Sequence, residues 1–483
     1  MKTPNARLVI GHGKPYPTYK ESGVPWMGQI PQDWDVLPAL AVYREKHVPN
    51  TGMIEATVLS ISYGRIIVKP LEKLHGLVPQ SFETYQIVDP GNIIVRTTDL
   101  QNDRVSPRIG LSQYRGIITS AYMCLETTSR ASSQFGYQFL NAIDLLKVIY
   151  GYGSGLRQNL GFDDIKRMPV LVPPISEQLA ITRFLSHVDG SIHRYVAAKQ
   201  KLIKLLERQK LSIIDDAITH GLDSSASRRP SGRDWLGNMP RHWSTTRLKF
   251  IASDIVDCLH ATPSYSDDGS YPAIRTADVT PGALLLSNAR RVDEEQYRAW
   301  TQRMTPIEGD ILYTREGERF GIAALVPADV QLCISQRMMA FRIKPKYNSE
   351  YIMWQLNCSH VYAQAACDLI GSAAPHVNVE RIKNFWLLTP PREEQDRIVS
   401  ALKGATAEID SAIQHTRDEI RLIREYRTRL IADVVIGKID IREIAADLPD
   451  EDDAPSTLLA VDEDLASTDG AEIPSEDEVE ATA

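Results

Sequence analysis

The stretches PPISEQLAITRFL at residues 173–185 and PPREEQDRIVSAL at residues 390–402 are two versions of one phrase. Both place acidic residues shortly after two prolines. Proline is tolerated in the first turn of a helix, and acidic side chains are favourable at the positive end of the helix dipole. Each phrase therefore predicts a helix start. An offset of 217 residues pairs Pro174 with Pro391, Glu177 with Glu394, Gln178 with Gln395, Ile181 with Ile398, and Leu185 with Leu402.

A second pair of matching stretches lies upstream of the first. SGVPWMGQIPQDW begins at Ser22 and SGRDWLGNMPRHW begins at Ser231, an offset of 209 residues. The two offsets differ by eight, so the intervening segment is eight residues longer in the second copy. The chain is therefore predicted to hold two unequal copies of one unit. The match pairs Trp26 with Trp235, Gly28 with Gly237, Pro31 with Pro240, and Trp34 with Trp243.

Each copy is mixed in composition between its tryptophan-containing entry and its proline pair. Short β-branched and aromatic runs predict strands there: ATVLSISYGRIIV and GNIIVRT in the first copy, GDILYTR and CISQRMMAFRI in the second. Each copy then ends in the predicted helix. We therefore expect two α+β domains with a shared skeleton and different loops.

Both helices are predicted to be long, with a heptad seam and a glycine, Gly221 or Gly437, at the end. About 45 residues at roughly 1.5 Å per residue give a rod of about 65–70 Å. Two helices of matched length are expected to pair in antiparallel fashion, with a globular domain preceding each. The predicted seam is Ile181, Leu185, Val188, Ile192, Tyr195, Lys199, Leu202, Leu206, Gln209 and Ile213, then Ile398, Leu402, Ala405, Ile409, Ala412, Thr416, Glu419, Ile423, Tyr426 and Leu430.

Polar residues interrupt this seam near the two midpoints. Lys199 and Thr416 lie near the middle of their helices. One hypothesis is that they meet and help to fix the register of the pair. The alternative is a polar interruption of a partly exposed seam.

The predicted fold class is α+β, with two globular domains separated by two long antiparallel coiled-coil helices, a pseudo-twofold internal repeat and a disordered acidic C-terminal tail. The predicted boundaries are residues 1–172 for the first entry segment and domain, 173–222 for the first helix, 223–389 for the second entry segment and domain, 390–442 for the second helix, and 443–483 for the tail.

The net charge of −8 hides an uneven distribution. The tail from Glu443 to Ala483 holds 15 acidic residues and no Lys or Arg, and leaving them out turns −8 into +7 for the rest. A mildly basic body is compatible with nucleic-acid binding but is weak support alone. The tail has few apolar residues to bury and reads as a solubilising segment.

Several protein classes find no support in the sequence. A chain of 483 residues usually forms more than one domain. No apolar run approaches the roughly 18 residues of a membrane span, and the N-terminus lacks a signal-peptide core, so a cytoplasmic location is expected. Disulfide frameworks and zinc sites are not indicated, because no C-x-x-C spacing occurs among Cys124, Cys258, Cys333, Cys358 and Cys367.

These features together resemble the specificity subunit of Type I restriction-modification systems, over roughly residues 17–442. The resemblance rests on the doubled P-P-x-x-E-Q helix, the doubled W-x-G-x-x-P-x-x-W entry, and the endings DDAITHGLD and ADVVIGKID. DCLHATPSY from Asp257, followed by YPAIRTADVTPGAL, is similar to target-recognition domains of that family. The acidic tail after Arg442 departs from the pattern.

The resemblance implies two target-recognition domains, each reading one half of a split sequence in double-stranded DNA while the helices set the separation. It also implies that the helices recruit two methyltransferase subunits and, through them, restriction and translocase subunits. S-adenosylmethionine, ATP and Mg²⁺ would then belong to those partners. No cofactor or metal is expected in this chain, and no membrane is expected as a partner.

DNA contacts are expected from Arg, Lys, Gln, Asn and Ser/Thr side chains in the variable loops, since Arg pairs with guanine and Gln or Asn with adenine. For any one residue the alternative is a solvated or salt-bridged surface side chain. Because the two sets differ, we expect an asymmetric target. The candidates are Arg65, Lys69, Arg96, Arg104, Arg108, Gln113 and Arg115 in the first domain, and Arg275, Arg290, Arg291, Arg315, Arg319, Gln336 and Arg337 in the second.

The sequence offers no assembled catalytic motif. It contains no G-x-x-x-x-G-K-[ST], no H-E-x-x-H and no N-P-P-[FY]. GYGSG at 151–155 lacks the spacing of a dinucleotide-binding loop and is interpreted as an ordinary loop. Cys258 and His260 are interpreted as residues of core packing or of a loop hydrogen bond, in preference to a metal site. A non-catalytic DNA-reading subunit is the prediction, and the alternative is a coiled-coil scaffold without sequence-specific DNA binding.

Two sets of repeated residues have structural and functional interpretations. The entry tryptophans could stack on bases, but packing of a domain against the helix pair is the favoured interpretation. The pairs Glu177 and Gln178, and Glu394 and Gln395, are interpreted first as helix-start residues and second as contacts to methyltransferase subunits.

Overall fold

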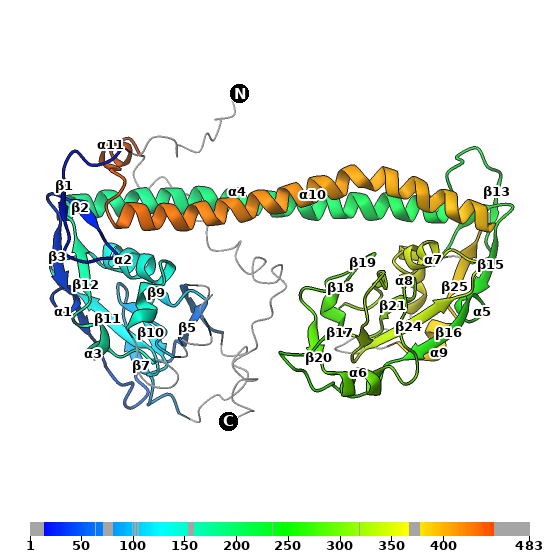
Figure 1. Ribbon diagram of the computed structural model, residues 1–483, viewed down its shortest axis with the longest axis horizontal. Helices are drawn as coiled ribbons and strands as arrows, with labels where there is room; N and C mark the ends of the chain where they lie inside the picture. The colour runs from blue at the N-terminus through cyan, green and yellow to red at the C-terminus, as the bar shows by residue number, and fades with distance from the viewer. Residues whose placement is uncertain are drawn as a thin grey trace. The chain divides into compact units, whose positions relative to one another are not determined.

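The computed structural model describes residues 14–62, 64–70, 81–98, 100, 103, 106–152, 159–233, 235–317, 319–366 and 377–448 (Figure 1). Arg104, Cys367, most of the GYGSG stretch and all but the first residues of the acidic tail lie outside this part. The described residues form two compact units. The first unit holds those up to Ala198 together with 418–448, and the second holds those from Lys199 to Arg417.

The first unit begins with a hairpin of β1 (Tyr19–Glu21) and β2 (Gln29–Pro31). Next, β3 (Asp35–Pro38) pairs in antiparallel fashion with β12 (Pro169–Val172), the last strand before the proline pair. The start and the end of the globular part are therefore adjacent. The short helix α1 (Ala39–Val42) links β3 to the main sheet.

An antiparallel four-stranded sheet forms the centre of this globular part, with strand order β4-β11-β8-β9. Helix α2 packs on it, with Gly136 so close to the sheet that an added Cβ would lie 2.7 Å from a methyl carbon of Thr127. Smaller pairs flank this sheet. The elements are β4 (Tyr43–Glu45), β5 (Leu59–Ser62), β6 (Arg65–Val68), β7 (Gln86–Val88), β8 (Ile93–Val95), β9 (Ile109–Leu111), β10 (Gly116–Ile118), β11 (Met123–Thr127), α2 (Ser133–Leu145), η2 (Val148–Gly151) and α3 (Phe162–Ile165).

The second unit follows the same order of elements. A hairpin, β13 (Arg228–Pro230) with β14 (Asn238–Pro240), precedes β15 (Ser244–Arg247), which pairs with β25 (Trp386–Thr389). The short helix α5 (Leu248–Ile251) again links to an antiparallel sheet, here ordered β16-β24-β21-β22.

A three-stranded sheet is added in the second unit, with β17 parallel to β23 and antiparallel to β20. The α+β fold class predicted from the sequence is confirmed. The remaining elements of this unit are β16 (Ala252–Asp257), β17 (Tyr271–Ile274), η3 (Thr276–Asp278), β18 (Val279–Thr280), β19 (Ala283–Leu284), β20 (Arg290–Val292), α6 (Glu294–Trp300), β21 (Ile311–Thr314), β22 (Ala323–Leu325), β23 (Cys333–Ile334), β24 (Met338–Ile343), α7 (Ser349–Leu356), α8 (Ser359–Ala366) and α9 (Val379–Lys383).

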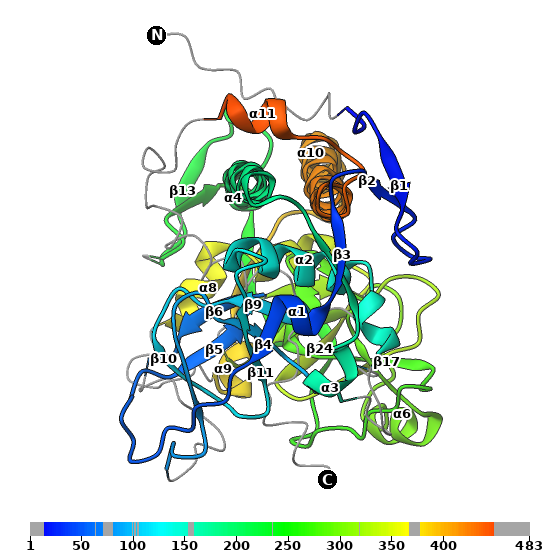
Figure 2. The same cartoon turned by 90° about the vertical axis from the view of Figure 1, so that its left-hand side faces the viewer.

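The two proline pairs are followed by the two longest helices. Helix α4 spans Ile175–His220 and helix α10 spans Arg392–Val435, so both predicted helix starts are confirmed. Each helix contributes to both units, because the units divide α4 after Ala198 and α10 after Arg417. In the first unit α4 and α10 run side by side above α2 (Figures 1 and 2). A short helix, α11 (Arg442–Ala446), follows α10.

Ion pairs join the two helices within each unit. In the first unit, the Arg427 guanidinium donates two hydrogen bonds of 2.8 Å to the Asp189 carboxylate. In the second unit, Lys210 Nζ lies 2.6 Å from Asp410. These pairings connect the early part of one helix to the late part of the other, which is the antiparallel order. Among the described residues, no helix is long and apolar enough to cross a bilayer.

The buried stripe of each long helix differs from the predicted seam. In α4 the burial pattern moves by one residue after Ile192, so that Val196 is buried while Leu202 is 40% exposed. In α10, Thr406 and Ile413 are buried in place of Ala405 and Ala412. One extra step of four moves every second seam position by one residue, while predicted positions such as Thr416 and Leu430 remain buried. The Thr416 hydroxyl donates to Ala412 O of its own helix at 2.8 Å, and a contact with Lys199 stays a prediction.

Candidate nucleic-acid interface

The repeated glutamine of each proline phrase fastens a long helix to its globular domain. Gln178 is buried; its Oε1 accepts from the Ser132 backbone N at 2.9 Å, and its Nε2 donates to Pro173 O at 2.9 Å. Ser132 is the N-cap residue of α2. Gln178 therefore fixes the start of α4 against the start of α2.

The second unit repeats this arrangement. Gln395 Oε1 accepts from the backbone N of Asn348 at 2.9 Å, and Gln395 Nε2 donates to Pro390 O at 2.8 Å. Asn348 is the N-cap residue of α7. Both glutamines are thus positioning residues, and an amide is needed because the same side chain must accept and donate.

The repeated glutamates hold the entry segments. The Tyr16 hydroxyl donates to Glu177 at 2.6 Å, and His242 Nε2 lies 2.8 Å from Glu394. Burial, together with the bond to Glu177, raises the pKa of the Tyr16 hydroxyl far above its ordinary value, so this group stays protonated and donates. The favoured interpretation of these glutamates as helix-start residues agrees with these contacts.

Two of the entry tryptophans are buried at the ends of the long helices. An added Cβ on Gly437, just after α10, would lie 3.1 Å from Trp34, and one on Gly221, just after α4, would lie 3.1 Å from Trp243. Both glycines have positive φ, near 75°, as at helix C-termini. For Trp34 and Trp243 the packing interpretation is confirmed. Trp26 and Trp235 are half-buried.

One edge of the first domain carries two candidate arginines next to each other. Arg96 follows β8 and Arg108 precedes β9, so both lie at the same end of the sheet. Arg108 is 0% exposed, and its guanidinium donates to Thr98 O at 2.7 Å and to the Tyr150 hydroxyl at 3.1 Å. Arg96 is paired with Asp103. Arg108 therefore holds the chain near Thr98 in place by hydrogen bonds and does not reach the surface.

Other candidates of the first domain lie at the surface. Arg65, at the start of β6, donates to His193 Nε2 of α4 at 2.9 Å. Arg115 is exposed and pairs with Asp89 at 2.7 Å, while Lys46 holds the pKa of that carboxyl below its usual value. Gln113 is exposed and Lys69 is half-exposed. These four side chains remain the accessible first-domain candidates.

The second domain gathers most of its candidates at one edge. The ends of β16 and β21 and the start of β24 meet there, because Asp257 and Thr314 pair with neighbouring residues of β24. Arg315 N donates to Arg337 O at 2.8 Å, which brings these two loops together. The Arg315 side chain is 3% exposed and bonds to Asp257 at 3.0 Å, so it braces the edge from inside.

The candidates Arg275, Arg319, Gln336 and Arg337 border this edge. Arg275 is held by two 3.0 Å hydrogen bonds to Asp278, and Arg319 donates to Val279 O at 2.7 Å. Gln336 is half-buried and Arg337 is exposed, with a left-handed backbone at φ 64°. The backbone hydrogen bond from Arg315 N to Arg337 O holds the loop that carries Arg337, and Arg337 itself is exposed.

Two surface pockets adjoin Arg290 and Arg291. One, of about 450 Å³, is lined by Tyr265, Ser266, Asp267, Ala289, Arg290 and Arg291. The Arg290 guanidinium lies 5.0 Å above the Tyr265 ring, and the Tyr265 hydroxyl lies 3.3 Å from Ser335 Oγ. Sequence reasoning missed Tyr265, although its position in an Asp- and Gly-rich loop was a usable signal. A larger pocket, of about 800 Å³, is also bordered by Arg291.

The side chains at these edges suit an anionic ligand that accepts hydrogen bonds. Cationic guanidinium groups are backed by carboxylates and an aromatic ring, and they offer hydrogen-bond donors and positive charge to phosphates and base edges.

Cys258 is buried and its pKa is raised by burial, so it behaves as a packed thiol. Among the described residues, one group of side chains is close enough to share a metal ion: Asp215 on α4, Cys358 just before α8 and His360 within α8.

Residues 257–421, which include the second-domain edge, match the family model of the Type I restriction modification DNA specificity domain. A curated relative, the type I restriction enzyme MjaX specificity subunit of Methanocaldococcus jannaschii, is 22% identical over 291 residues. That alignment covers 58% of this chain and 61% of the relative, so the chain spans about three fifths of the relative's length. The resemblance found in the sequence is confirmed: the chain carries a type I specificity domain.

One solved structure shares the fold. This structure, described as the structural basis of complex assembly and conformational transition of the type I R-M system, has a TM-score of 0.54, with 14% identity over 85% of this chain and 99% of that chain. The HsdS subunit from Thermoanaerobacter tengcongensis is also 14% identical, over 85% of this chain and 98% of that chain, but its TM-score of 0.38 is too low to inform the fold.

Proposed function

We propose that this chain is the sequence-specific DNA-binding specificity subunit of a Type I restriction-modification complex. The observation that carries the proposal is the match of residues 257–421 to the specificity domain, because that segment contains every second-domain candidate from Arg275 to Arg337. The alternative, a scaffold without sequence-specific DNA binding, leaves these clustered arginines unexplained.

Each globular domain would read one half of a bipartite target. The two domains differ in chemistry: the first presents Arg65, Gln113 and Arg115 at its surface. The second presents Arg337 and, above the Tyr265 ring, Arg290. Since bidentate arginine favours guanine and glutamine favours adenine, different sets select different bases. The target is therefore expected to be asymmetric.

The long helices would set the spacing between the half-sites as an antiparallel coiled coil. The repeated Gln178 and Gln395 contacts support this role, because each fixes one recognition domain to the start of one helix. The same contacts support an internal repeat with pseudo-twofold symmetry. A change in helix length should then change the gap between half-sites while preserving both half-sites.

Catalysis would come from partner subunits. We propose that the chain has no activity alone and recruits two methyltransferase subunits, through which the restriction and translocase subunits join. S-adenosylmethionine, ATP and Mg²⁺ would be bound by those subunits. The solved structure described in terms of type I complex assembly supports this proposal by its fold.

The proposal is tested by selecting DNA with the reconstituted complex. The chain, co-purified with its methyltransferase subunits, is incubated with a random duplex library, and bound DNA is sequenced. Enrichment of one split motif with a fixed gap supports the proposal. Binding without sequence enrichment, at a salt concentration where non-specific phosphate contacts are weak, favours the scaffold alternative.

A further inference from the structure

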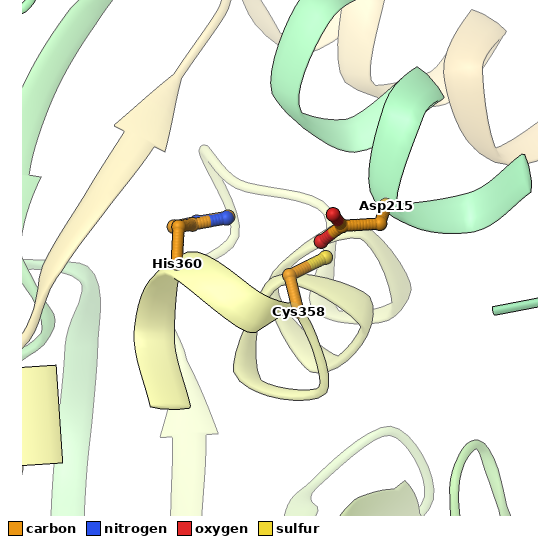
Figure 3. Close-up of side chains that lie close together, drawn as sticks. All are labelled: Asp215, Cys358 and His360. Atoms are coloured by element: carbon orange, nitrogen blue, oxygen red, sulfur yellow. The ribbon is translucent and has the colours of Figure 1, made fainter. Parts of the chain in front are cut away.

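Three side chains with metal-binding groups lie together inside the second unit (Figure 3). Asp215 comes from the last turns of α4, Cys358 from the turn between α7 and α8, and His360 from the first turn of α8. A carboxylate oxygen, the sulfur and a ring nitrogen all lie within 4.8 Å of one another. The group joins a long helix to the second globular domain.

His360 is the member of this group that has no hydrogen-bond partner. Its side chain is 5% exposed, and neither ring nitrogen has a partner among the described residues. Figure 3 shows an imidazole nitrogen directed toward the Asp215 carboxylate. Buried polar groups in native proteins are almost always satisfied, and Val361, the residue after His360, belongs to the apolar core of the second unit. A ligand for its nitrogen is therefore missing from the protein itself.

The other two groups are already held in place. Asp215 accepts from the Ser359 backbone N at 3.1 Å and from the Ser359 hydroxyl at 3.0 Å, so it caps the first turn of α8. Its two oxygens still have lone pairs available. The Cys358 thiol donates to Trp354 O at 3.2 Å. The carboxylate is thus oriented by backbone contacts in the way that supporting residues orient metal ligands.

We propose that Asp215, Cys358 and His360 bind one divalent transition-metal ion, and that the ion is Zn²⁺. A sulfur, nitrogen and oxygen donor set suits Zn²⁺, which takes four ligands at about 2.0–2.3 Å. The side chains draw toward the ion, and a water or the Ser359 hydroxyl takes the fourth position. The Cys358 thiol loses its proton to solvent and exchanges its hydrogen bond to Trp354 O for a bond to the metal.

The ion acts as a clamp between α4 and α8 and has no counterpart in the first unit. The 217-residue offset places Ala432 opposite Asp215. The shared N-cap contacts, at Ser132 and Asn348, place Ala142 opposite Cys358 and Asp144 opposite His360. Asp144 instead accepts from Arg108 N at 2.9 Å. The cluster is therefore specific to one copy of the repeat and is independent of the proposed DNA-binding function.

The test measures metal bound by the full chain, co-purified with whatever subunits it requires. We expect about one Zn²⁺ per chain by elemental analysis, and X-ray absorption with a single sulfur neighbour at about 2.3 Å. Replacement by Co²⁺ should produce a thiolate-to-cobalt charge-transfer band. Cys358→Ser and His360→Asn should each abolish that band. Cys333→Ser, which removes another buried thiol of the same unit, should leave it unchanged.

Several results would overturn the proposal. These are a wild-type chain that takes up no Zn²⁺ or Co²⁺ on titration to micromolar excess, a cobalt band that survives in Cys358→Ser, or an absorption spectrum without sulfur in the metal shell. The last measurement uses only the wild-type chain, so it decides the matter even where a variant fails to fold. DNA selection by the complex is measured separately and does not depend on this outcome.

Discussion

Gln178 and Ser132 are joined by a 2.9 Å hydrogen bond from the Ser132 backbone N to the Gln178 side-chain oxygen. This bond connects the start of a 46-residue helix to α2 of the first globular domain. The second unit repeats it between Gln395 and Asn348. The repeated glutamine therefore has a structural reason in each copy: it couples the orientation of one globular domain to that of one long helix.

Removing this tie should loosen one domain at a time. Gln178→Ala leaves the Ser132 N–H and two carbonyl oxygens without their partner, and we expect a loss of about 2–3 kcal/mol in the stability of the first unit. Amide hydrogen exchange should increase in α2 but not in α7. Gln113→Ala, at an exposed position, is the matched control and should change neither. Unaltered exchange in α2 would show that the hydrogen bond is dispensable.

Gly437, just after α10, and Gly190, within α4, should respond in opposite directions to alanine. At Gly437 the backbone φ is 76° and an added Cβ would lie 2.5 Å from Pro31, so Gly437→Ala should destabilise the first unit by about 1–3 kcal/mol. At Gly190 nothing lies within 4 Å, so Gly190→Ala should stabilise α4 by about 0.5–1 kcal/mol. Chemical denaturation measures both. If both substitutions changed the free energy of unfolding in the same direction, the opposite roles given to these two glycines would be wrong.

The two recognition edges should be separable by mutation. Arg290→Ala combined with Arg291→Ala should weaken binding of the complex to its target by about 10- to 100-fold and relax selectivity in one half-site only. Lys383→Ala, on α9 beside α5, should leave binding unchanged, because that helix is away from the edge. Loss of selectivity in both half-sites after the arginine change would argue against one domain per half-site.

His193 should make the first unit sensitive to mild acid. Burial lowers the pKa of this histidine below its ordinary value of 6.5, and Arg65 and Arg427 add to the effect. The unfolded chain then takes up the proton more readily than the folded chain, so stability present at pH 7.5 is lost as pH falls through about 6.5.

Replacing the ring should remove that sensitivity. The loss of unfolding free energy between pH 7.5 and pH 5.5 should be smaller in His193→Gln than in the wild type. His415→Gln, at an exposed position of α10, should keep the wild-type difference. An unchanged pH dependence in His193→Gln would mean that other groups control acid sensitivity.

Repeated phrases made the helix starts, the α+β class and the packing of Trp34 and Trp243 predictable from the sequence. Every second position of the predicted seam was wrong by one residue, because a strict heptad pattern does not detect a single extra step of four. Arg108 and Arg315 were chosen as surface candidates, yet both are buried, since a sequence does not reveal that loop carbonyls and carboxylates will enclose a guanidinium.

The cluster around His360 was not predictable, because Asp215 is far from it along the chain. Asp215 is hydrogen-bonded to Ser359, and these two residues are 144 positions apart in the sequence. Spacing rules detect metal ligands that are close along the chain, and here only Cys358 and His360 are close. The tertiary contact between α4 and α8 supplies the third group.

Mapping of N6-methyladenine across the host genome, with and without this gene, tests the DNA-reading proposal most directly. The expected result is one asymmetric split motif with a fixed gap that loses its methylation on deletion. A strain carrying Arg290→Ala and Arg291→Ala should show relaxed methylation in one half of that motif. Methylation that is identical with and without the gene, in a strain that expresses the partner subunits, would contradict the proposal.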